Sequence, residues 1–488
     1  MSIRLSKLRS LVPSSFLRCA LLAAPLALAS LAAGCGDDTQ SSQGDITDVK
    51  NSSVKNQSIG NCWIYATMGW AESLHLTHSG EELNLSESWV SYWHWYEEIA
   101  GAPPGLVALA KLDKEQLSTG GWFGLAGEIV RRYGVITEGK FIPEEAEAAR
   151  SSRQSQAQNA INASLKTGAL MSVTARADRK LVRAELDKAW GLAPTVIASL
   201  DKVYGDTVSR SLLTSGISIP SDSGIQFIRE ITVGRNITLA DAFGEPSSSY
   251  NVLQRKGKYA WNEVSYPSTA TGRRDLQRRM QAAMHEGMPV IMSWFVDFAA
   301  MTGTRFLAPP TSPGQQGGHM TVVEDYQVTQ VPGFGTLAAG TLVTDPKALA
   351  AALDPKATIE FIRIKNSWGL GLAPNESGAE FRGYYDLYAA YLDASLTKCT
   401  EANGDKCGTK SQVGGLTSFV LPPAAFVTDS KVKEGSCGDI CIAGPARAAA
   451  CDSCTDLICS EDPYCCASAW DEACVVKSSE ICELTCKL

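Results

Sequence analysis

Residues 54–71, VKNQSIGNCWIYATMGWA, place one cysteine at the start of an apolar segment with the composition of a buried helix. Asn61 is suited to cap that helix, so Cys62 would lie in its first turn. Unpaired N–H groups and the positive end of the helix dipole favour thiolate over thiol at such a position. The pattern makes Cys62 a candidate nucleophile, with a buried structural cysteine as the alternative, because free cysteines are usually buried.

Length and charge bound the class of protein. The chain has 488 residues, 44% of them hydrophobic, which is enough for a large core and exceeds one typical domain. The net charge is -8, the charged residues are dispersed and no long basic run occurs. We therefore expect a globular protein with at least two units and no nucleic-acid partner.

Residues 1–35 have the pattern of an export signal, with four basic residues followed by an apolar run from Ala20 to Ala33. That run is too short to span a bilayer comfortably. Residues 31–35, LAAGC, resemble a bacterial lipoprotein signal, which implies lipid modification of Cys35. Ordinary signal-peptidase cleavage is the alternative, because the leucine stands one place early. We expect an exported protein, either a cell-envelope lipoprotein bound to the membrane by this anchor or a secreted one, with residues 36–50 as a flexible tether.

The cysteines fall into two groups with different expected chemistry, a crowded C-terminal set and the isolated Cys62. Of 15 cysteines, 12 lie between Cys399 and Cys486, whereas residues 36–398 contain only Cys62. In an exported protein an even, crowded set implies disulfide bonds. An isolated thiol in an oxidising compartment is a liability unless it is buried or used, so this distribution favours a catalytic role for Cys62.

The tail after residue 428 is predicted to be a small disulfide-stapled module. It contains ten cysteines from Cys437 onward and no histidine, so five disulfides are favoured over a zinc site at Cys451 and Cys454. The adjacent Cys465 and Cys466 are expected to bond to different partners. A domain this small needs such staples, because it cannot bury enough apolar surface to be stable unaided. Cys399 and Cys407, which precede the module, could close a surface loop.

A cysteine nucleophile needs a base, and the chain has five histidines. His75 and His78 lie near the far end of the helix begun by Cys62, roughly 20 Å away at 1.5 Å per residue. His94 and His285 lie in helical segments, where packing or surface roles are the simpler interpretation. His319 differs, because it follows Gly317-Gly318 and opens a β-prone run, so it can face a cleft from a strand start.

A third group should orient the imidazole, and Asn366 is placed to do so. Residues 358–365 form a predicted strand, in which Ile362, Ile364 and the following Asn366 share one face by the period of two. The indole of Trp368 could then cover an Asn–His hydrogen bond and keep water from it.

The order of these motifs carries a resemblance to a known family. The chain has Gln57, then Cys62-Trp63, then Gly318-His319 before a strand, then the segment 365–369, KNSWG. In this order they resemble the papain-like cysteine peptidases.

The resemblance implies a role for each matching residue. Cys62 would be the nucleophile and His319 its base and later acid, the two forming an ion pair, while Asn366 would hold the His319 ring. Gln57 and the backbone N–H of Cys62 would form the oxyanion hole. Gln57 stands five residues before Cys62, one fewer than is usual in the family, so either Gln57 or Asn56 supplies the donor.

A particular branch of the family is also suggested. Residues 85–89, LSESW, and 119–122, TGGW, look like stretches of bleomycin hydrolase and its bacterial aminopeptidase relatives. The resemblance implies that Gly120 and Gly121 line the cleft and, with Trp368, contact substrate. The long interval before His319 indicates a helical insertion at about residues 141–271.

The sequence therefore predicts an α+β protein with a papain-like two-lobe fold, one lobe helical and one β-barrel-like. Residues 51–427 would form the peptidase domain with its insertion, and residues 428–488 the cysteine-rich module. The expected function is hydrolysis of peptide bonds in a peptide or protein substrate through a thioester, with no cofactor and no metal. A catalytically silent binding or adhesion protein and a transpeptidase or acyltransferase are the alternatives. Side-chain preference, aminopeptidase or endopeptidase action and oligomeric state stay open.

Overall fold

The computed structural model describes residues 45–47, 49–112, 115–146, 152–248, 251–370, 382–400, 402–403, 406–430, 440–445, 447, 451, 453–467, 469–482 and 486. The predicted export signal, with the lipidation expected at Cys35, and most of the predicted tether lie outside the described residues. Among the described residues, no helix combines the length and the apolar character needed to cross a membrane.

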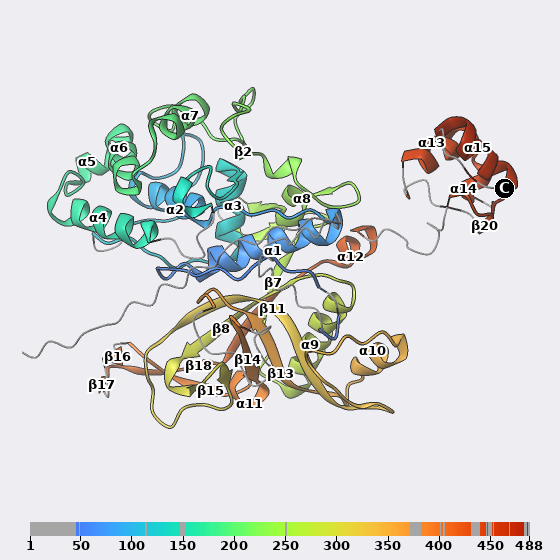
Figure 1. Cartoon of the computed structure of the whole chain (residues 1–488). Coiled ribbons are helices and arrows are strands. Elements are labelled where there is room, and N and C mark those ends of the chain that lie inside the picture. Colours follow the sequence, from blue (N-terminus) through green and yellow to red (C-terminus); the bar gives the residue numbers. More distant parts are fainter. Residues whose placement is uncertain are drawn as a thin grey trace, which may run out of the picture. The chain divides into compact units, whose positions relative to one another are not determined.

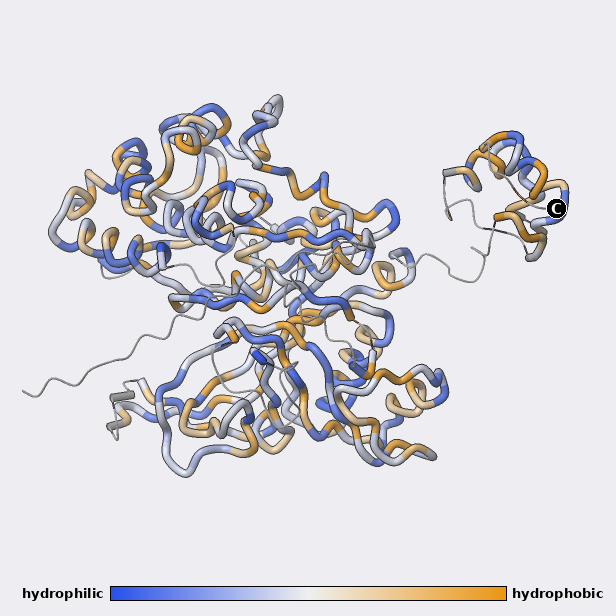
Figure 2. The backbone as a smooth tube through the Cα atoms, viewed as in Figure 1, coloured by the Kyte–Doolittle hydropathy of each residue, from blue (hydrophilic) through white to orange (hydrophobic). Residues whose placement is uncertain are grey.

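The first part of the fold is helical (Figure 1). Its helices are α1 (Cys62–Ser79), α2 (Glu87–Ala100), α3 (Phe123–Tyr133), α4 (Arg153–Thr167), α5 (Val173–Ala177), α6 (Arg179–Trp190) and α7 (Pro194–Tyr204), with the short 3-10 helix η1 (Pro143–Glu145) before α4. The interleaving of polar and apolar residues along α4 to α7 is visible in Figure 2, as expected for helices that bury one face. The segment predicted as a helical insertion at about residues 141–271 is thus helical in its first part.

Helix α1 is the central element of the described fold. It begins at Cys62 as predicted, its residues 62–74 are all buried, and it packs against α2 and α3 as well as against the sheet. A helix that is apolar all round is stable only inside a protein, which explains this position. Its C-terminus is closed by Gly80 in the left-handed conformation, with φ 73°.

The predicted cap of α1 is wrong in one respect. Asn61 precedes the helix, but its side chain makes no capping hydrogen bond. Its amide nitrogen instead donates to Ser91 Oγ at 3.1 Å and to Gln154 Oε1 at 3.0 Å. The tertiary contacts use the Nδ2 donor, whereas the Oδ1 atom that would accept from the helix N–H groups is buried without a hydrogen-bond partner among the described residues.

The second part of the fold is a sheet in which nine described strands take part. In order across it lie β7 (Asn262–Ser265), β19 (Leu416–Leu421), β8 (Val290–Asp297), β11 (Gln316–Val331), β13 (Thr358–Lys365), β14 (Tyr384–Tyr388), β10 (Arg305–Phe306) and β9 (Met301–Thr302), with β12 (Gly335–Leu337) paired to β11. The pairs are antiparallel except β10 with β14. The strand predicted at residues 358–365 is confirmed as β13, and β11 lies between it and β8.

The remaining elements before the hairpin and the tail are mostly short. They are β1 (Val135–Ile136), β2 (Ile225–Gln226), η2 (Ile228–Glu230), β3 (Thr232–Gly234), β4 (Ile237–Thr238), α8 (Leu239–Phe243), β5 (Glu245–Ser248), β6 (Asn251–Lys256), α9 (Ala270–His285), η3 (Phe298–Ala300), α10 (Pro346–Ala352), α11 (Ala389–Leu392) and α12 (Ala424–Ser430). The helical character of the insertion therefore lies before residue 205, whereas residues 225–265 contribute mainly short strands.

A hairpin next to the sheet carries the first predicted disulfide. It comprises β15 (Ser395–Cys399), β16 (Ala402–Asn403), β17 (Lys406–Cys407) and β18 (Lys410–Gly414). Cys399 and Cys407 are bonded, as predicted. The backbone N–H of Cys399 donates to Gln316 Oε1 at 2.9 Å, so the hairpin touches the first residue of β11.

The cysteine-rich tail has its own hydrophobic cluster, built on Ile458, Trp470 and disulfide-bonded cysteines. Its elements are β20 (Gly444–Pro445), α13 (Ser453–Glu461), α14 (Tyr464–Ala467), β21 (Ala469–Trp470) and α15 (Glu472–Cys482). The described bonds join Cys441 with Cys486, Cys454 with Cys482, Cys459 with Cys466, and Cys465 with Cys474.

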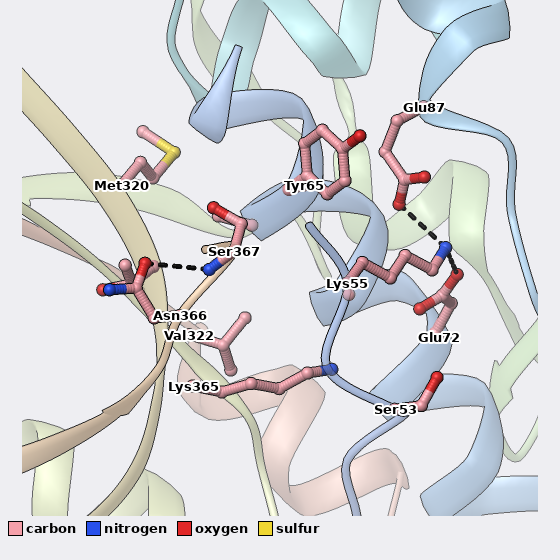
Figure 3. A pocket seen from close by; sticks show the side chains of 13 residues that line it. Ser53, Lys55, Tyr65, Glu72, Glu87, Met320, Val322, Lys365, Asn366 and Ser367 are labelled. Atoms are coloured by element: carbon pink, nitrogen blue, oxygen red, sulfur yellow. Dashed lines mark hydrogen bonds and ion pairs between the residues drawn. The ribbon is translucent and has the colours of Figure 1, made fainter. Parts of the chain in front are cut away.

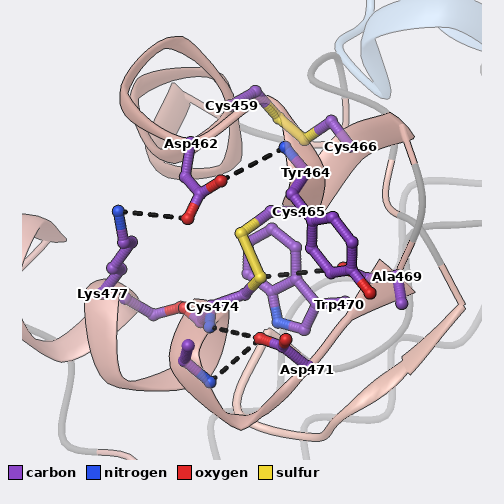
Figure 4. The surroundings of a disulfide bond; sticks show 12 residues. Cys459, Asp462, Tyr464, Cys465, Cys466, Ala469, Trp470, Asp471, Cys474 and Lys477 are labelled. Carbon is purple, nitrogen blue, oxygen red and sulfur yellow. Dashed lines mark hydrogen bonds and ion pairs between the residues drawn. A yellow bond between two sulfur atoms is a disulfide. The ribbon is translucent and has the colours of Figure 1, made fainter.

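These bonds settle two predictions about the tail. Cys465 and Cys466 have different partners, as expected, and the bond from Cys465 lies beside the Trp470 indole in Figure 4. Cys454 is bonded to Cys482, and Cys451 is also disulfide-bonded. The zinc alternative for this pair is therefore wrong, because a disulfide sulfur is not a thiolate ligand.

The predicted fold class is confirmed. The structure combines a helical part, a large mixed sheet and a disulfide-rich C-terminal segment, which is an α+β architecture.

Candidate active site

Cys62 opens α1 where that helix meets the sheet. It is 8% exposed and is the free cysteine of the described residues. The backbone N–H of Met320, in β11, lies close enough to the sulfur to lower the pKa of the Cys62 thiol. Helix α1 and strand β11 thus bring the sulfur to the backbone of the residue that follows His319.

His319 and Asn366 are joined as the sequence predicts. His319 Nε2 lies 2.8 Å from Asn366 Oδ1, and both residues are buried. The two residues come from adjacent antiparallel strands, since β11 pairs with β13 and Asn366 follows the end of β13. The same Oδ1 also accepts the backbone N–H of Ser367 at 2.8 Å.

This hydrogen bond selects the tautomer of His319. Asn366 Oδ1 can only accept, so Nε2 of the neutral ring carries the hydrogen that it donates. Nδ1 is then the unprotonated nitrogen and the one able to take a proton. Among the described contacts, no hydrogen bond joins the Cys62 sulfur to the ring, so proton transfer requires the two groups to approach each other.

Aromatic rings enclose the imidazole. Trp368 stacks on His319 with centroids 4.8 Å apart and 17° between the planes. Trp294, from β8, meets the His319 ring edge-on at 5.5 Å. Phe298, which is 40% exposed, packs against Trp368 at 5.2 Å. The predicted cover of the His–Asn pair by Trp368 is therefore present.

Burial controls the protonation of the pair. It raises the pKa of the Cys62 thiol to about 11, although three backbone N–H groups act in the opposite direction. It lowers the pKa of His319 to about 4, and the hydrogen bond to Asn366 only partly offsets this. Both directions favour the neutral thiol and the neutral imidazole at pH 7. The resting ion pair implied by the family resemblance is therefore not favoured in this enclosed site.

Gln57 is held beside the site by two side-chain hydrogen bonds. Its Nε2 donates to Ile59 O at 2.9 Å, and its Oε1 accepts from Ser367 Oγ at 2.5 Å. Asn56 forms an isolated bridge with Trp368, and its side chain lies against Gly369. The Gln57 amide nitrogen carries two hydrogens, so it can donate to Ile59 O and keep one for a reacting oxygen, whereas Asn56 lies against another segment.

Gly120 and Gly121 lie next to the nucleophile helix. A Cβ at Gly121 would lie 2.4 Å from the Trp63 ring, so only glycine allows this approach. Trp63 Nε1 also donates to Thr119 O at 2.7 Å. A Cβ at Gly120 would meet only Ser118 Oγ, at 4.0 Å, so this position is open. Residues 119–121 are thus held against Trp63, the residue after Cys62, and no side chain of the described residues packs over Gly120.

A small polar cavity lies behind the site, between α1 and the ends of β11 and β13 (Figure 3). Its volume of about 20 Å³ suits a single water molecule. Lys55 Nζ lies there 2.8 Å from Glu87 and 3.0 Å from Glu72, and Lys365 Nζ donates to Ser52 Oγ at 2.8 Å. These paired charges tie α1 to the segment before it, because leaving one unpaired and buried is costly.

Sequence reasoning missed two polar sets around Cys62. One is the pairing of Lys55 with Glu72 and Glu87. A glutamate within the apolar run of α1, Glu72, could have indicated from the sequence that a buried cation pairs with it. The other is the contact of Gln154 with Asn61, for which the sequence carries no signal, since Gln154 lies in a polar helix far along the chain.

The other histidines do not join the site. His75 hydrogen-bonds the carbonyl of Thr232, and His285 hydrogen-bonds Tyr326. His94 is buried edge-on against Trp63. Over the described part of the chain, no group of three or more His, Cys, Asp or Glu residues could hold a metal ion.

Comparisons with known proteins add limited information. Residues 435–486 match a family model described as "Domain of unknown function (DUF8252)". No curated protein matches the chain in sequence. The chain is similar to the bromelain protease from Ananas comosus in complex with the E64 inhibitor, with 13% identity, a TM-score of 0.28, and coverage of 76% of this chain and 93% of that one. It is also similar to PepW from Lactobacillus rhamnosis HN001, with 12% identity, a TM-score of 0.38, and coverage of 79% and 83%. Likenesses this distant leave the function to be argued from the site itself.

Proposed function

We propose that this protein is an exported cysteine peptidase that hydrolyses peptide bonds through a thioester on Cys62. The observation that carries the proposal is the His319–Asn366 hydrogen bond on strand β11, which packs against the helix that Cys62 opens. A thiol, an imidazole with one free nitrogen and an amide that orients the ring are the groups that acyl transfer by cysteine requires.

The acylation step follows from the tautomer of His319. The Cys62 proton moves to Nδ1 as the sulfur attacks the substrate carbonyl, so that an S–C bond forms and the C=O electrons move onto oxygen. The tetrahedral species then collapses, the C–N bond breaks, and the imidazolium gives its proton to the leaving amine. Asn366 keeps the ring oriented throughout, since it accepts from Nε2 in each protonation state.

The second half of the reaction reverses these roles. A water molecule loses a proton to Nδ1 as its oxygen attacks the thioester, and the S–C bond breaks to return the thiol and release the acid. In the proposal the oxyanion accepts from the Cys62 backbone N–H, a donor that a helix start leaves without an intrahelical partner. Gln57 would supply a second donor through the N–H of its amide that does not bond Ile59 O.

The finer parts of the proposal rest on the sequence. Export, with a cell-envelope lipid anchor at Cys35, rests on the signal pattern, and the disulfides of residues 399–486 agree with an oxidising compartment. The family is proposed to be papain-like, in the bleomycin hydrolase-like branch, because of the ordered motifs. Gly120, Gly121 and Trp368 are proposed to contact the peptide substrate.

Turnover of a fluorogenic peptide library and labelling by a thiol-reactive epoxide test the proposal, with Cys62→Ala as the control. We expect the wild-type protein to turn over peptides and to take up one label on the peptide that contains Cys62. Equal turnover or labelling in Cys62→Ala contradicts it. A folded wild-type protein with no thiol reactivity favours a binding protein, and amide products formed with an added amine favour a transpeptidase.

A further inference from the structure

We propose that Gln154, in the helical insertion, is a positioning residue for the nucleophile, so that helix α4 is part of the catalytic apparatus. This inference rests on the proposed function. It gives the insertion a direct role at the site, because α4 reaches the start of α1.

Gln154 is buried at the base of the nucleophile helix. The residue is 1% exposed, although it lies in the polar first turn of α4. Its Oε1 accepts from Asn61 Nδ2 at 3.0 Å, and its Nε2 lies 3.1 Å from both Tyr65 Oη and Ser88 Oγ. The Gln154 amide thus contacts three residues: Asn61 just before Cys62, Tyr65 about one turn after it, and Ser88 in α2.

The Asn61 contact acts where α1 begins. Asn61 makes no side-chain cap, so the entry turn of the helix is fixed from outside by Gln154 and Ser91. The next residue in the chain is Cys62, whose sulfur direction and backbone N–H depend on the conformation of that turn. A shift of about 1 Å in such a group can cost about a hundredfold in rate.

The amide network extends to a second insertion residue. Ser88 Oγ donates to Glu145 Oε1 at 2.9 Å, and Glu145 belongs to η1 at the start of the insertion. Asn61, Gln154, Ser88 and Glu145 are all buried. Asn61 Oδ1 has no partner in this network, whereas the Gln154 amide uses both its oxygen and its nitrogen. Loss of that amide would leave Asn61, Tyr65 and Ser88 each with one partner fewer in a buried place, where this is costly.

The same helix also holds the segment that leads to Gly120 and Gly121. Asn162 Oδ1, two turns along α4, accepts the backbone N–H of Leu117 at 2.9 Å. Leu117 leads into the segment 118–121, whose Thr119 carbonyl accepts from Trp63. Helix α4 therefore contacts both the entry to the nucleophile helix and the glycine segment beside it. The two contacts predict different kinetic effects, one on the reactivity of Cys62 and one on substrate binding.

The test compares the same substitution at two sites of α4 in the full chain. Gln154→Met keeps the side-chain volume and removes the amide, whereas Gln156→Met changes an exposed residue two positions away. We expect Gln154→Met to lower kcat by about tenfold or more with KM nearly unchanged. Alkylation of Cys62 by iodoacetamide, followed by mass spectrometry of its tryptic peptide, should slow by a comparable factor. Gln156→Met should stay within about twofold of wild type in both measurements. Asn162→Ala should instead raise KM and leave alkylation unchanged.

A double-mutant cycle with Asn61→Ala tests whether the effect passes through this hydrogen bond. If it does, the Asn61→Ala and Gln154→Met double variant is no slower in alkylation than the slower single variant. Asn61→Ala alone also tests the contact if Gln154→Met does not fold. Wild-type reactivity of Cys62 in folded Gln154→Met, or effects that multiply in the double variant, overturns the proposal. If the wild-type protein hydrolyses no peptide, the proposed function fails, while the alkylation comparison still decides the role of Gln154.

Discussion

The indole of Trp368 lies parallel to the imidazole of His319, with centroids 4.8 Å apart and 17° between the planes. Trp368 is itself partly exposed, so it separates the His319–Asn366 hydrogen bond from solvent. Burial lowers the pKa of His319 to about 4, so this cover contributes to keeping the imidazole neutral at pH 7.

Trp368→Leu should therefore raise the pKa of His319 toward its ordinary value. The acid limb of the kcat/KM profile, which requires the unprotonated ring, should move from about pH 4 toward pH 6. Phe298→Leu is the matched control, because Phe298 contacts the outer face of Trp368. An equal shift in both variants would show that the contact of Trp368 with His319 is not the cause.

Asn366→Ala should lower kcat by about tenfold or more, since a lost hydrogen bond that orients a reacting group costs about 1–3 kcal/mol. The ring of His319 would lose the acceptor of its Nε2–H and with it the preference for a free Nδ1. Steady-state kinetics measure the effect, and far-UV circular dichroism checks the fold. Ser367→Ala leaves this acceptor in place and should retain more activity, so a larger loss there contradicts the assignment.

Alkylation of Cys62 should increase continuously with pH. Because burial raises its pKa to about 11 and lowers that of His319 to about 4, the neutral pair is favoured between these values. The iodoacetamide rate should rise through pH 7 to 10 without a plateau near neutrality. A plateau from about pH 5 to 8 that disappears in His319→Ala would indicate a resting ion pair instead.

The same pKa shift affects stability. The folded-state pKa of Cys62 lies above the ordinary value of about 8.5, so the folded protein favours the thiol. This contribution to the free energy of unfolding is complete below pH 8.5 and is lost as pH rises toward 11. The stability difference between wild type and Cys62→Ser, measured by urea unfolding, should therefore shrink over that interval. A difference that is constant with pH contradicts this expectation.

The Cys399–Cys407 disulfide should stabilise the hairpin beside the start of β11. Its sequence separation of 8 corresponds to about 2–3 kcal/mol of chain entropy removed from the unfolded state. The double variant Cys399→Ser and Cys407→Ser should lose stability of this order in urea unfolding. KM should change little, because the hairpin meets Gln316 rather than His319. Unchanged stability would contradict a structural role for this bond.

Elements with a strong local pattern were predictable from the sequence. Helix α1 begins at Cys62, and β13 spans Thr358–Lys365, since apolar runs with clear ends specify such elements locally. The Cys399–Cys407 bond joins close neighbours in a hairpin, so their spacing alone indicated it. The pairing of His319 with Asn366 followed from the family resemblance and from their positions on two predicted strands.

Only the tertiary structure decided how the side chains around Cys62 are used. The Asn61 side chain donates to Gln154 instead of capping its helix, and Gln57 donates to Ile59 O. Burial shifts the pKa values of Cys62 and His319 toward the neutral forms instead of the expected ion pair. Each of these outcomes depends on partners that are distant in sequence or on exclusion of water. A local pattern determines which residues form a helix or a strand, whereas the choice among hydrogen-bond partners and protonation states depends on the packing of the whole fold.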